Sequence, residues 1–355
     1  MSAERARPHI DAHDERALHA TLRFAVAVTA AFVLSEWLRW APTFMAPALV
    51  AVLLANLPIR PPLRMSVALV VTMAGAALFA FALAALLRGT PIVLFGLISL
   101  CMFLAFHVMA SGRMRLPAML LLICLGTIPV VVMIAPVGAG ILPVALIRGI
   151  ALAVLAIAAV YVAWPCAPEP RPATARPMAD ASPFAIAAVS TAVVVPLMLF
   201  YLLFGLADAL PVMVATVMLV ANFDLQRTRM HALGMIVGNF AGGLLGLLIH
   251  AALMTTPSLP FLALLLFAVM LAFGRRIAAG GPAAAVALIA CNTMLIILST
   301  ALAADSASLA LWLTRLFQFA LAAAFAVGMM NLIWHRAAWS SAARLDAPAA
   351  GLPGP

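Results

Sequence analysis

Long apolar runs, separated by short polar or proline- and glycine-containing breaks, recur along the 355-residue chain. Runs of about 17–25 apolar residues are long enough to cross a hydrocarbon core near 30 Å as α-helices. Apolar residues are continuous within each run, whereas strands of a membrane barrel would alternate apolar and polar positions. The pattern predicts an all-α polytopic membrane protein of about twelve transmembrane helices. The expected spans are 17–38, 41–58, 65–87, 91–110, 117–135, 143–163, 183–206, 209–223, 230–254, 258–274, 280–301 and 308–334.

Composition agrees with the membrane class and excludes two kinds of functional site that need a lysine. The sequence is 67% hydrophobic and 9% charged, with a mean hydropathy of +1.20, and a soluble protein could not bury that much apolar surface. All 20 basic side chains are arginine. The lack of lysine excludes a Walker A phosphate loop and lysine Schiff-base chemistry. The four cysteines form no CxxC pattern, so neither a disulfide framework nor a zinc site is expected. No other metal site and no cofactor are expected.

The arginines predict the orientation of the chain. If the N-terminus is cytoplasmic, sixteen arginines fall at cytoplasmic ends of spans, and Arg39 and Arg88 alone lie in outer loops. This positive-inside bias predicts a multi-pass membrane protein with both termini in the cytoplasm. It also accounts for the formal charge of +9 without any nucleic-acid partner.

One polar segment, "AWPCAPEPRPATARPMADASP", interrupts the apolar texture at residues 163–183 and is typical of an extended linker. It divides the chain into two halves with six expected spans each. The expected parts are a cytoplasmic tail at 1–16, a first transmembrane repeat at 17–163, a cytoplasmic linker at 164–182, a second repeat at 183–334 and a C-terminal tail at 335–355.

The two halves resemble each other at a nearly constant shift. Five features match when the first half is moved by 165–167 residues, which indicates an internal duplication. Because each half has an even number of spans, both enter the membrane from the same side, as parallel repeats do. The matched features are Asn56 with Asn222, Thr90-Pro91 with Thr256-Pro257, residues 68, 72, 76 and 80 with Gly234, Gly238, Gly242 and Gly246, Pro117 with Pro282, and Arg148 with Arg315.

The stretch "GMIVGNFAGGLLG" repeats glycine at every fourth position, at Gly234, Gly238, Gly242 and Gly246. In lipid, helices associate through close backbone approach, which small residues spaced by four permit. The ladder therefore predicts a helix-packing seam. The seam either serves packing alone or slides during a transport cycle.

Residues 221–250, "ANFDLQRTRMHALGMIVGNFAGGLLGLLIH", resemble the fusaric acid resistance and aromatic acid exporter group of bacterial inner-membrane proteins. The group shows a span, a short basic turn, an arginine and glycines spaced by four, which Arg229 and the glycine ladder match. The resemblance implies efflux of aromatic carboxylates or similar amphiphiles. It also implies a periplasmic adaptor protein as a partner.

Two pairs of residues are candidates for substrate binding. Asn56 and Asn222 close short or proline-containing spans at matching positions, which in transporters point to a binding site. The alternative is that their amides cap helix ends. Arg148 and Arg315 lie inside spans, where they either hold an anion or are neutralised by acids and snorkel outward. A guanidinium suits a carboxylate because its fork donates two parallel hydrogen bonds.

The candidates for proton coupling are Glu36, Asp208, His250 and Asp305, because a desolvated carboxyl or imidazole can titrate near neutral pH. The sequence favours a secondary exporter of small amphiphilic organic anions. The alternative is a non-transporting membrane scaffold or assembly partner. No GxSxG, HExxH or paired acidic motif is present, so an enzyme is not expected.

Overall fold

The computed structural model describes residues 7–56, 61–112, 114–134, 138, 140–165, 182–203, 225–303, 313 and 317. Every regular element among these residues is an α-helix, which confirms the predicted fold class. Nine of the described helices are long and apolar enough to cross a membrane, and a tenth is shorter. The expected span at 209–223 and most of that at 308–334 lie outside the described residues.

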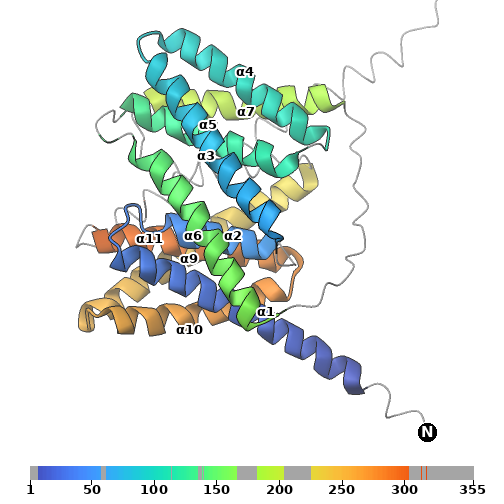
Figure 1. Ribbon diagram of the computed structural model, residues 1–355, viewed down its shortest axis with the longest axis vertical. Helices are drawn as coiled ribbons and strands as arrows, with labels where there is room; N and C mark the ends of the chain where they lie inside the picture. Colours follow the sequence, from blue (N-terminus) through green and yellow to red (C-terminus); the bar gives the residue numbers. More distant parts are fainter. Residues whose placement is uncertain are drawn as a thin grey trace, which may run out of the picture.

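The helices are labelled in Figure 1. They are α1 (Arg7–Trp37), α2 (Met45–Asn56), α3 (Leu63–Leu86), α4 (Pro91–Ala110), α5 (Arg115–Ile134), α6 (Ile141–Ala163), α7 (Pro183–Leu203), α9 (Leu225–Thr255), α10 (Leu259–Ala278) and α11 (Gly281–Ala303).

Several helices differ from the predicted spans: α9 begins five residues earlier, at Leu225, α10 ends four residues later, at Ala278, and α1 and α2 differ in ways that matter here. Helix α1 begins at Arg7, inside the expected tail, although its membrane-compatible part starts at Glu15. A helix can continue past the hydrocarbon because water satisfies its exposed polar side chains. Helix α2 has 12 residues, so it extends only about 18 Å and is too short for a full crossing. Residues 38–44, which contain Pro42, form the turn that replaces its expected beginning.

Helices α4 and α10 end in the same way. Gly112 has φ +76° and Gly280 has φ +73°, a left-handed conformation that glycine adopts without steric cost. Their amides donate at 3.1 Å to the carbonyls of Met109 and Ile277, respectively. The two halves therefore share the geometry of this helix end.

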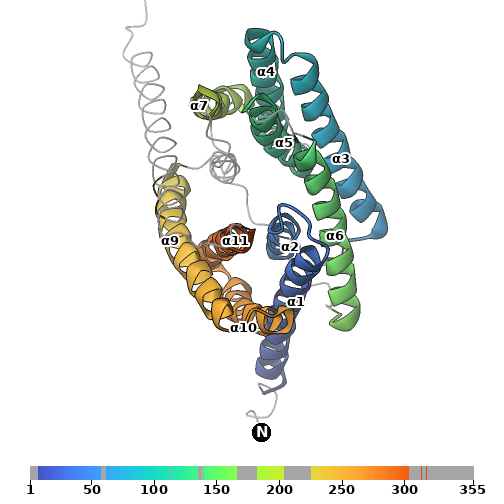
Figure 2. The ribbon, with the colours of Figure 1, turned by 90° about the vertical axis from the view of Figure 1, so that its left-hand side faces the viewer.

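The helices form two groups that are linked by oblique members. In Figure 1, α4, α5 and α7 lie above, α1, α10 and α11 lie below, and α3 and α6 cross between the two groups. Figure 2 shows α7, α11 and α2 nearly end-on, with α9 and α10 on one side and α3 and α6 on the other. Helix α2 packs on α1, α6 and α11, so it joins the first half to the second.

The contacts between the halves are reciprocal. Helix α1, at the first expected span of the first half, packs on α10, at the fourth expected span of the second half. Helix α7, at the first expected span of the second half, packs on α4, at the fourth expected span of the first half. The helices at the third and fifth expected spans of each half also pack together, as α3 with α5 and α9 with α11. This is the pairing that a two-fold relation between two equivalent halves produces.

Small residues allow the closest of these approaches. At the α1–α10 contact, a Cβ built on Gly274 would lie 3.0 Å from the Thr21 carbonyl oxygen. Ala27, Ala31, Ala77 and Ala80 are also buried in the core. Large apolar side chains such as Val71 and Leu104 instead remain exposed on the surface of the helices. In a membrane these exposed side chains face lipid, so exposure there costs nothing.

Candidate functional site

Arg148 lies near the start of α6, close to the connection between α1 and α2. Its Nη2 donates a short hydrogen bond to the carbonyl oxygen of Ala41. Its Cζ lies 5.0 Å from the centre of the Trp40 ring, within the range of a cation–π interaction. The α1–α2 connection therefore provides both a dipole and an aromatic face for the guanidinium.

The neighbouring Gly149 fixes the distance between α6 and α2. A Cβ at this position would lie 3.2 Å from Leu49 Cδ1 and 3.4 Å from Met45 Cγ. The close contact holds the start of α2 against α6 beside Arg148. The guanidinium is consequently positioned by packed helices on one side and by the Trp40 ring on the other.

Glu36 is the acid that the sequence offers as a partner for Arg148 in the first half. It lies in the last turns of α1 and is partly exposed. Within the described part of the chain, no ion pair joins Arg148 to Glu36. Arg148 instead donates to the Ala41 carbonyl. This hydrogen bond uses one of the five N–H donors of the guanidinium. The remaining donors can serve an anionic ligand.

His250 lies near the end of α9, and its side chain is only 6% exposed. Its Nδ1 is buried and has no hydrogen-bond partner among the described residues. An imidazole in such a place can exchange a proton only if a partner or water reaches it. Its role in proton coupling stays a prediction.

The four glycines of the ladder belong to α9, and they face α11. A Cβ built on Gly242 would stand 2.2 Å from the Ala290 carbonyl oxygen, far inside any real contact distance. At Gly238 and Gly246 the nearest backbone oxygens, of Val286 and Met294, would lie 3.0 Å away. The glycines thus let α9 and α11 approach closely over about two turns, and at Gly242 a larger residue would require the backbone to move.

A polar pair that the sequence reasoning missed lies in the middle of this seam. The hydroxyl of Thr293 donates to Oδ1 of Asn239, and the two side chains are 5% and 2% exposed. Asn239 follows Gly238 directly, so the sequence could have indicated this pair through the polar amide beside the glycine ladder. At a shift of 166 residues, Met73 takes the place of Asn239 and Thr127 takes the place of Thr293. The Thr127 hydroxyl donates at 2.7 Å to the Ile123 carbonyl of its own helix, and Met73 Sδ lies 3.8 Å from Cys124 Sγ.

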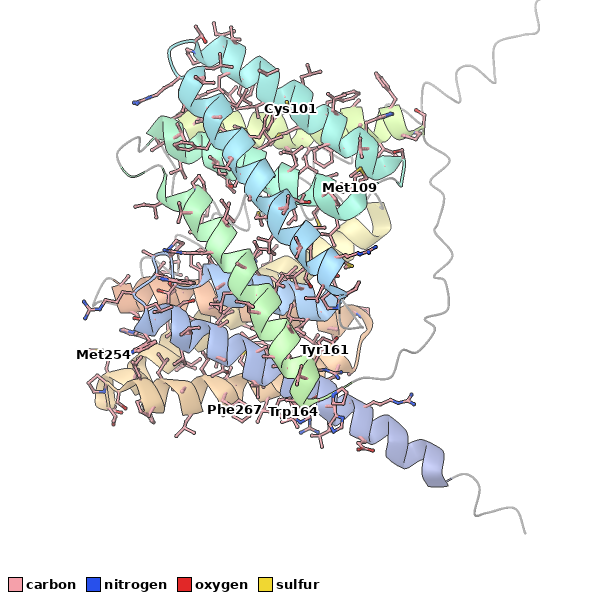
Figure 3. All side chains as sticks on the ribbon, in the orientation of Figure 1. Cys101, Met109, Tyr161, Trp164, Met254 and Phe267 are labelled. Carbon is pink, nitrogen blue, oxygen red and sulfur yellow. The ribbon has the colours of Figure 1, made fainter. Side chains whose placement is uncertain are left out.

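Arg23 is a second feature that the sequence reasoning missed, because it was counted as an ordinary cytoplasmic arginine. It is 6% exposed, its Cζ lies 4.8 Å from the Tyr161 ring centre, and its Nη1 donates at 2.9 Å to the Trp164 carbonyl. Figure 3 shows Tyr161 and Trp164 together at the end of α6, beside α1. The aromatic residues at the end of the sixth span could have indicated, from the sequence, a partner for a buried arginine. Arg23 thus ties α1 to the point where the linker begins.

Asn56 is the last residue of α2 and is exposed. Its Nδ2 donates at 2.8 Å to the Val52 carbonyl, one turn earlier in the same helix. The amide therefore satisfies its own helix end, the arrangement expected of a cap.

Several predicted residues have no described position. Asn222, Asp208, Asp305 and Arg315 lie outside the described residues. Arg229 belongs to α9, but its side chain is likewise not among those described. The structure therefore brings together Arg148, Trp40 and Ala41 at one site and the glycines with Asn239 and Thr293 at another.

The comparison with protein families covers the first half. Residues 20–160 match a family described as a protein of unknown function, DUF2955. The matched segment begins within α1 and ends within α6, so it corresponds to one six-helix unit. No curated protein and no solved structure matches the chain.

Proposed function

We propose that this protein is a secondary efflux transporter that uses an ion gradient to export small amphiphilic organic anions such as aromatic carboxylates. The observation that carries the proposal is the reciprocal packing of α1 on α10 and of α4 on α7. Transporters built from parallel repeats place their substrate site where the two repeats meet, near the middle of the bilayer.

Arg148 supports an anionic substrate. Its guanidinium is held inside a membrane span by the Trp40 ring and the Ala41 carbonyl, and it has donors to spare. A positive charge at such depth is costly and is a hypothesis of function by default. Arg315 occupies the matching place in the second half of the sequence. Two guanidinium groups facing one cavity would hold a carboxylate through paired hydrogen bonds.

Trp40 supports an aromatic substrate. The indole ring is partly exposed beside Arg148, so it can stack on a flat ligand whose carboxylate meets the guanidinium. The resemblance of residues 221–250 to aromatic acid exporters agrees with this substrate class. It also suggests a periplasmic adaptor as partner and a bacterial inner-membrane location, with both termini cytoplasmic as the arginine bias predicts.

Proton coupling is the simplest source of energy for this chain. The lack of lysine rules out a Walker A site in the protein itself. Glu36 near the end of α1 and the buried His250 in α9 are the described candidates for carrying the proton. Glu36 is partly exposed near the end of its span, whereas the buried His250 would need water or a partner to reach it before it could exchange a proton.

The test is transport in proteoliposomes with an imposed pH gradient, using a radiolabelled aromatic carboxylate such as benzoate. We expect uptake into inverted vesicles to fall by about 10- to 100-fold in Arg148→Ala, because a hydrogen bond to a charged group contributes about 1.5–3 kcal/mol. Arg148→Lys should retain part of the activity, since it keeps the charge but loses the fork. Arg88→Ala is the matched control, because Arg88 is an exposed arginine in a connection between helices.

Equal flux in Arg148→Ala and Arg88→Ala would refute the role of Arg148. Folded protein that transports no aromatic or aliphatic carboxylate would refute the exporter and favour the scaffold alternative. Circular dichroism and gel filtration in detergent distinguish a folded inactive variant from a misfolded one.

A further inference from the structure

An apolar cleft opens between α3, α4 and α5, away from the Arg148 site. Its volume is about 390 Å³, and its lining includes Thr72, Gly75, Phe79, Val108, Met114 and Leu121. Among the described residues, no charged side chain lines it, and Thr72 is the one lining residue with a hydroxyl group. A cavity of this size holds a small ligand or a stretch of hydrocarbon chain.

The cleft exists because α3 and α5 pack less closely than the corresponding helices of the second half, α9 and α11. At a shift of 166 residues, Gly242 of α9 corresponds to Ala76 of α3. Gly242 allows the Ala290 backbone to approach so closely that a Cβ would lie 2.2 Å from its carbonyl oxygen. Ala76 has that Cβ, so α3 cannot approach α5 as closely as α9 approaches α11. The space remains open in the first half, where a Cβ added at Gly75 would have no atom within 4 Å.

The surroundings of the cleft indicate what fills it. The neighbouring surfaces of α3 and α4 expose Val67, Val71, Leu100 and Leu104, and both helices are long enough to span a membrane. The medium outside the cleft is therefore hydrocarbon and not water. From Met114 to Leu121 the cleft follows α5 for about 10 Å, which is shorter than one leaflet of a core near 30 Å.

The sequence next to the Met114 end of the cleft is basic. Arg113 and Arg115 flank Met114 in the sequence, and Arg64 lies in the first turn of α3, about two turns before the lining residue Thr72. No acidic residue occurs between positions 37 and 168. Such a basic membrane face attracts anionic headgroups.

We propose that the cleft binds one acyl chain of an anionic phospholipid, whose headgroup lies at the basic end of α3 and α5. The chain enters alongside Met114 and extends past Gly75 toward Leu121. The lipid fills the volume that the missing glycine ladder leaves open, and it holds α3, α4 and α5 together in the first half.

The experiment uses the full-length protein in phosphatidylcholine nanodiscs that contain a small fraction of phosphatidylglycerol with a photoactivatable diazirine on its acyl chain. After illumination, mass spectrometry maps the labelled peptides. We expect labelling of α3 around residues 72–79 and of α5 around residues 117–121. Phosphatidylcholine with the same diazirine should label these segments at least fivefold less.

Gly75→Leu fills the cleft from α3 and should lower this labelling at least fivefold. Gly96→Leu is the matched control, because Gly96 is an exposed glycine of α4 with no atom within 4 Å of an added Cβ, and it does not line the cleft. If Gly75→Leu does not fold, Thr72→Leu blocks the same cleft. Unchanged labelling in a folded cleft-filling variant, or equal labelling by the two lipids, would overturn the proposal.

Discussion

Replacing Gly242 with alanine tests the closest helix contact in the protein. The added Cβ would lie 2.2 Å from the Ala290 carbonyl oxygen, about 1.2 Å inside the 3.4 Å at which ordinary contact begins. The obstacle is backbone, which cannot rotate away, so α9 and α11 must separate. Overpacking of this kind costs about 1–3 kcal/mol. Separation would also strain the hydrogen bond between Asn239 and Thr293, adding about 0.6–1.7 kcal/mol.

We therefore expect Gly242→Ala to lower the free energy of unfolding by about 2–4 kcal/mol. The assay is unfolding of purified protein in mixed micelles with increasing SDS, followed by tryptophan fluorescence. Gly75→Ala is the control, because it makes the same chemical change in a helix where an added Cβ meets nothing within 4 Å. Gly234→Ala should be milder than Gly242→Ala, since its nearest obstacle is the Val286 side chain, which can move.

Equal changes in the free energy of unfolding for Gly242→Ala and Gly75→Ala would refute the reasoning, because contact with the Ala290 backbone would then add no cost at Gly242. A more severe effect at Gly234 than at Gly242 would also contradict it. In that case the distance between α9 and α11 would not be set by backbone contact.

Three further predictions concern other parts of the molecule. A double-mutant cycle of Asn239→Leu and Thr293→Val should give a coupling energy of about 0.6–1.7 kcal/mol in the same SDS assay, and a value near zero would contradict the hydrogen bond. Arg23→Gln should lower the free energy of unfolding by about 2–4 kcal/mol through loss of the charged hydrogen bond and the ring contact, with Arg23→Lys falling between. A cysteine in place of Ala173 should react with a membrane-impermeant maleimide only in inverted vesicles, and labelling of intact cells would contradict the predicted orientation.

The span positions could be predicted from the sequence because they depend on local composition. Helix α4 was expected at 91–110 and is found at Pro91–Ala110, since Pro91 starts the helix and the Gly112 turn ends it. Helix α2 was predicted too long because apolar residues continue through its preceding turn. Composition does not reveal that Pro42 lies in a turn outside the helix.

The contacts between distant segments could not be predicted in the same way. Periodicity identified a packing face at Gly242, but not Ala290 as its partner. The partners of Arg23 follow it by 138 and 141 positions, so no local pattern connects them. The apolar cleft depends on Ala76 standing where the second half has Gly242. The effect of this difference can be recognised only by comparing the packing of the two halves.

The reciprocal pairing of helices has a consequence for biogenesis. Helix α1 leaves the ribosome well before its packing partner α10, which begins only at Leu259. At about 5–20 residues per second, α1 waits for about 10 to 50 seconds before that partner exists. During this interval the Thr21 surface has neither Gly274 nor any other part of α10 to cover it. The newly inserted first half must therefore persist as an incomplete domain, exposed to membrane quality control, until translation of the second half supplies the missing surface.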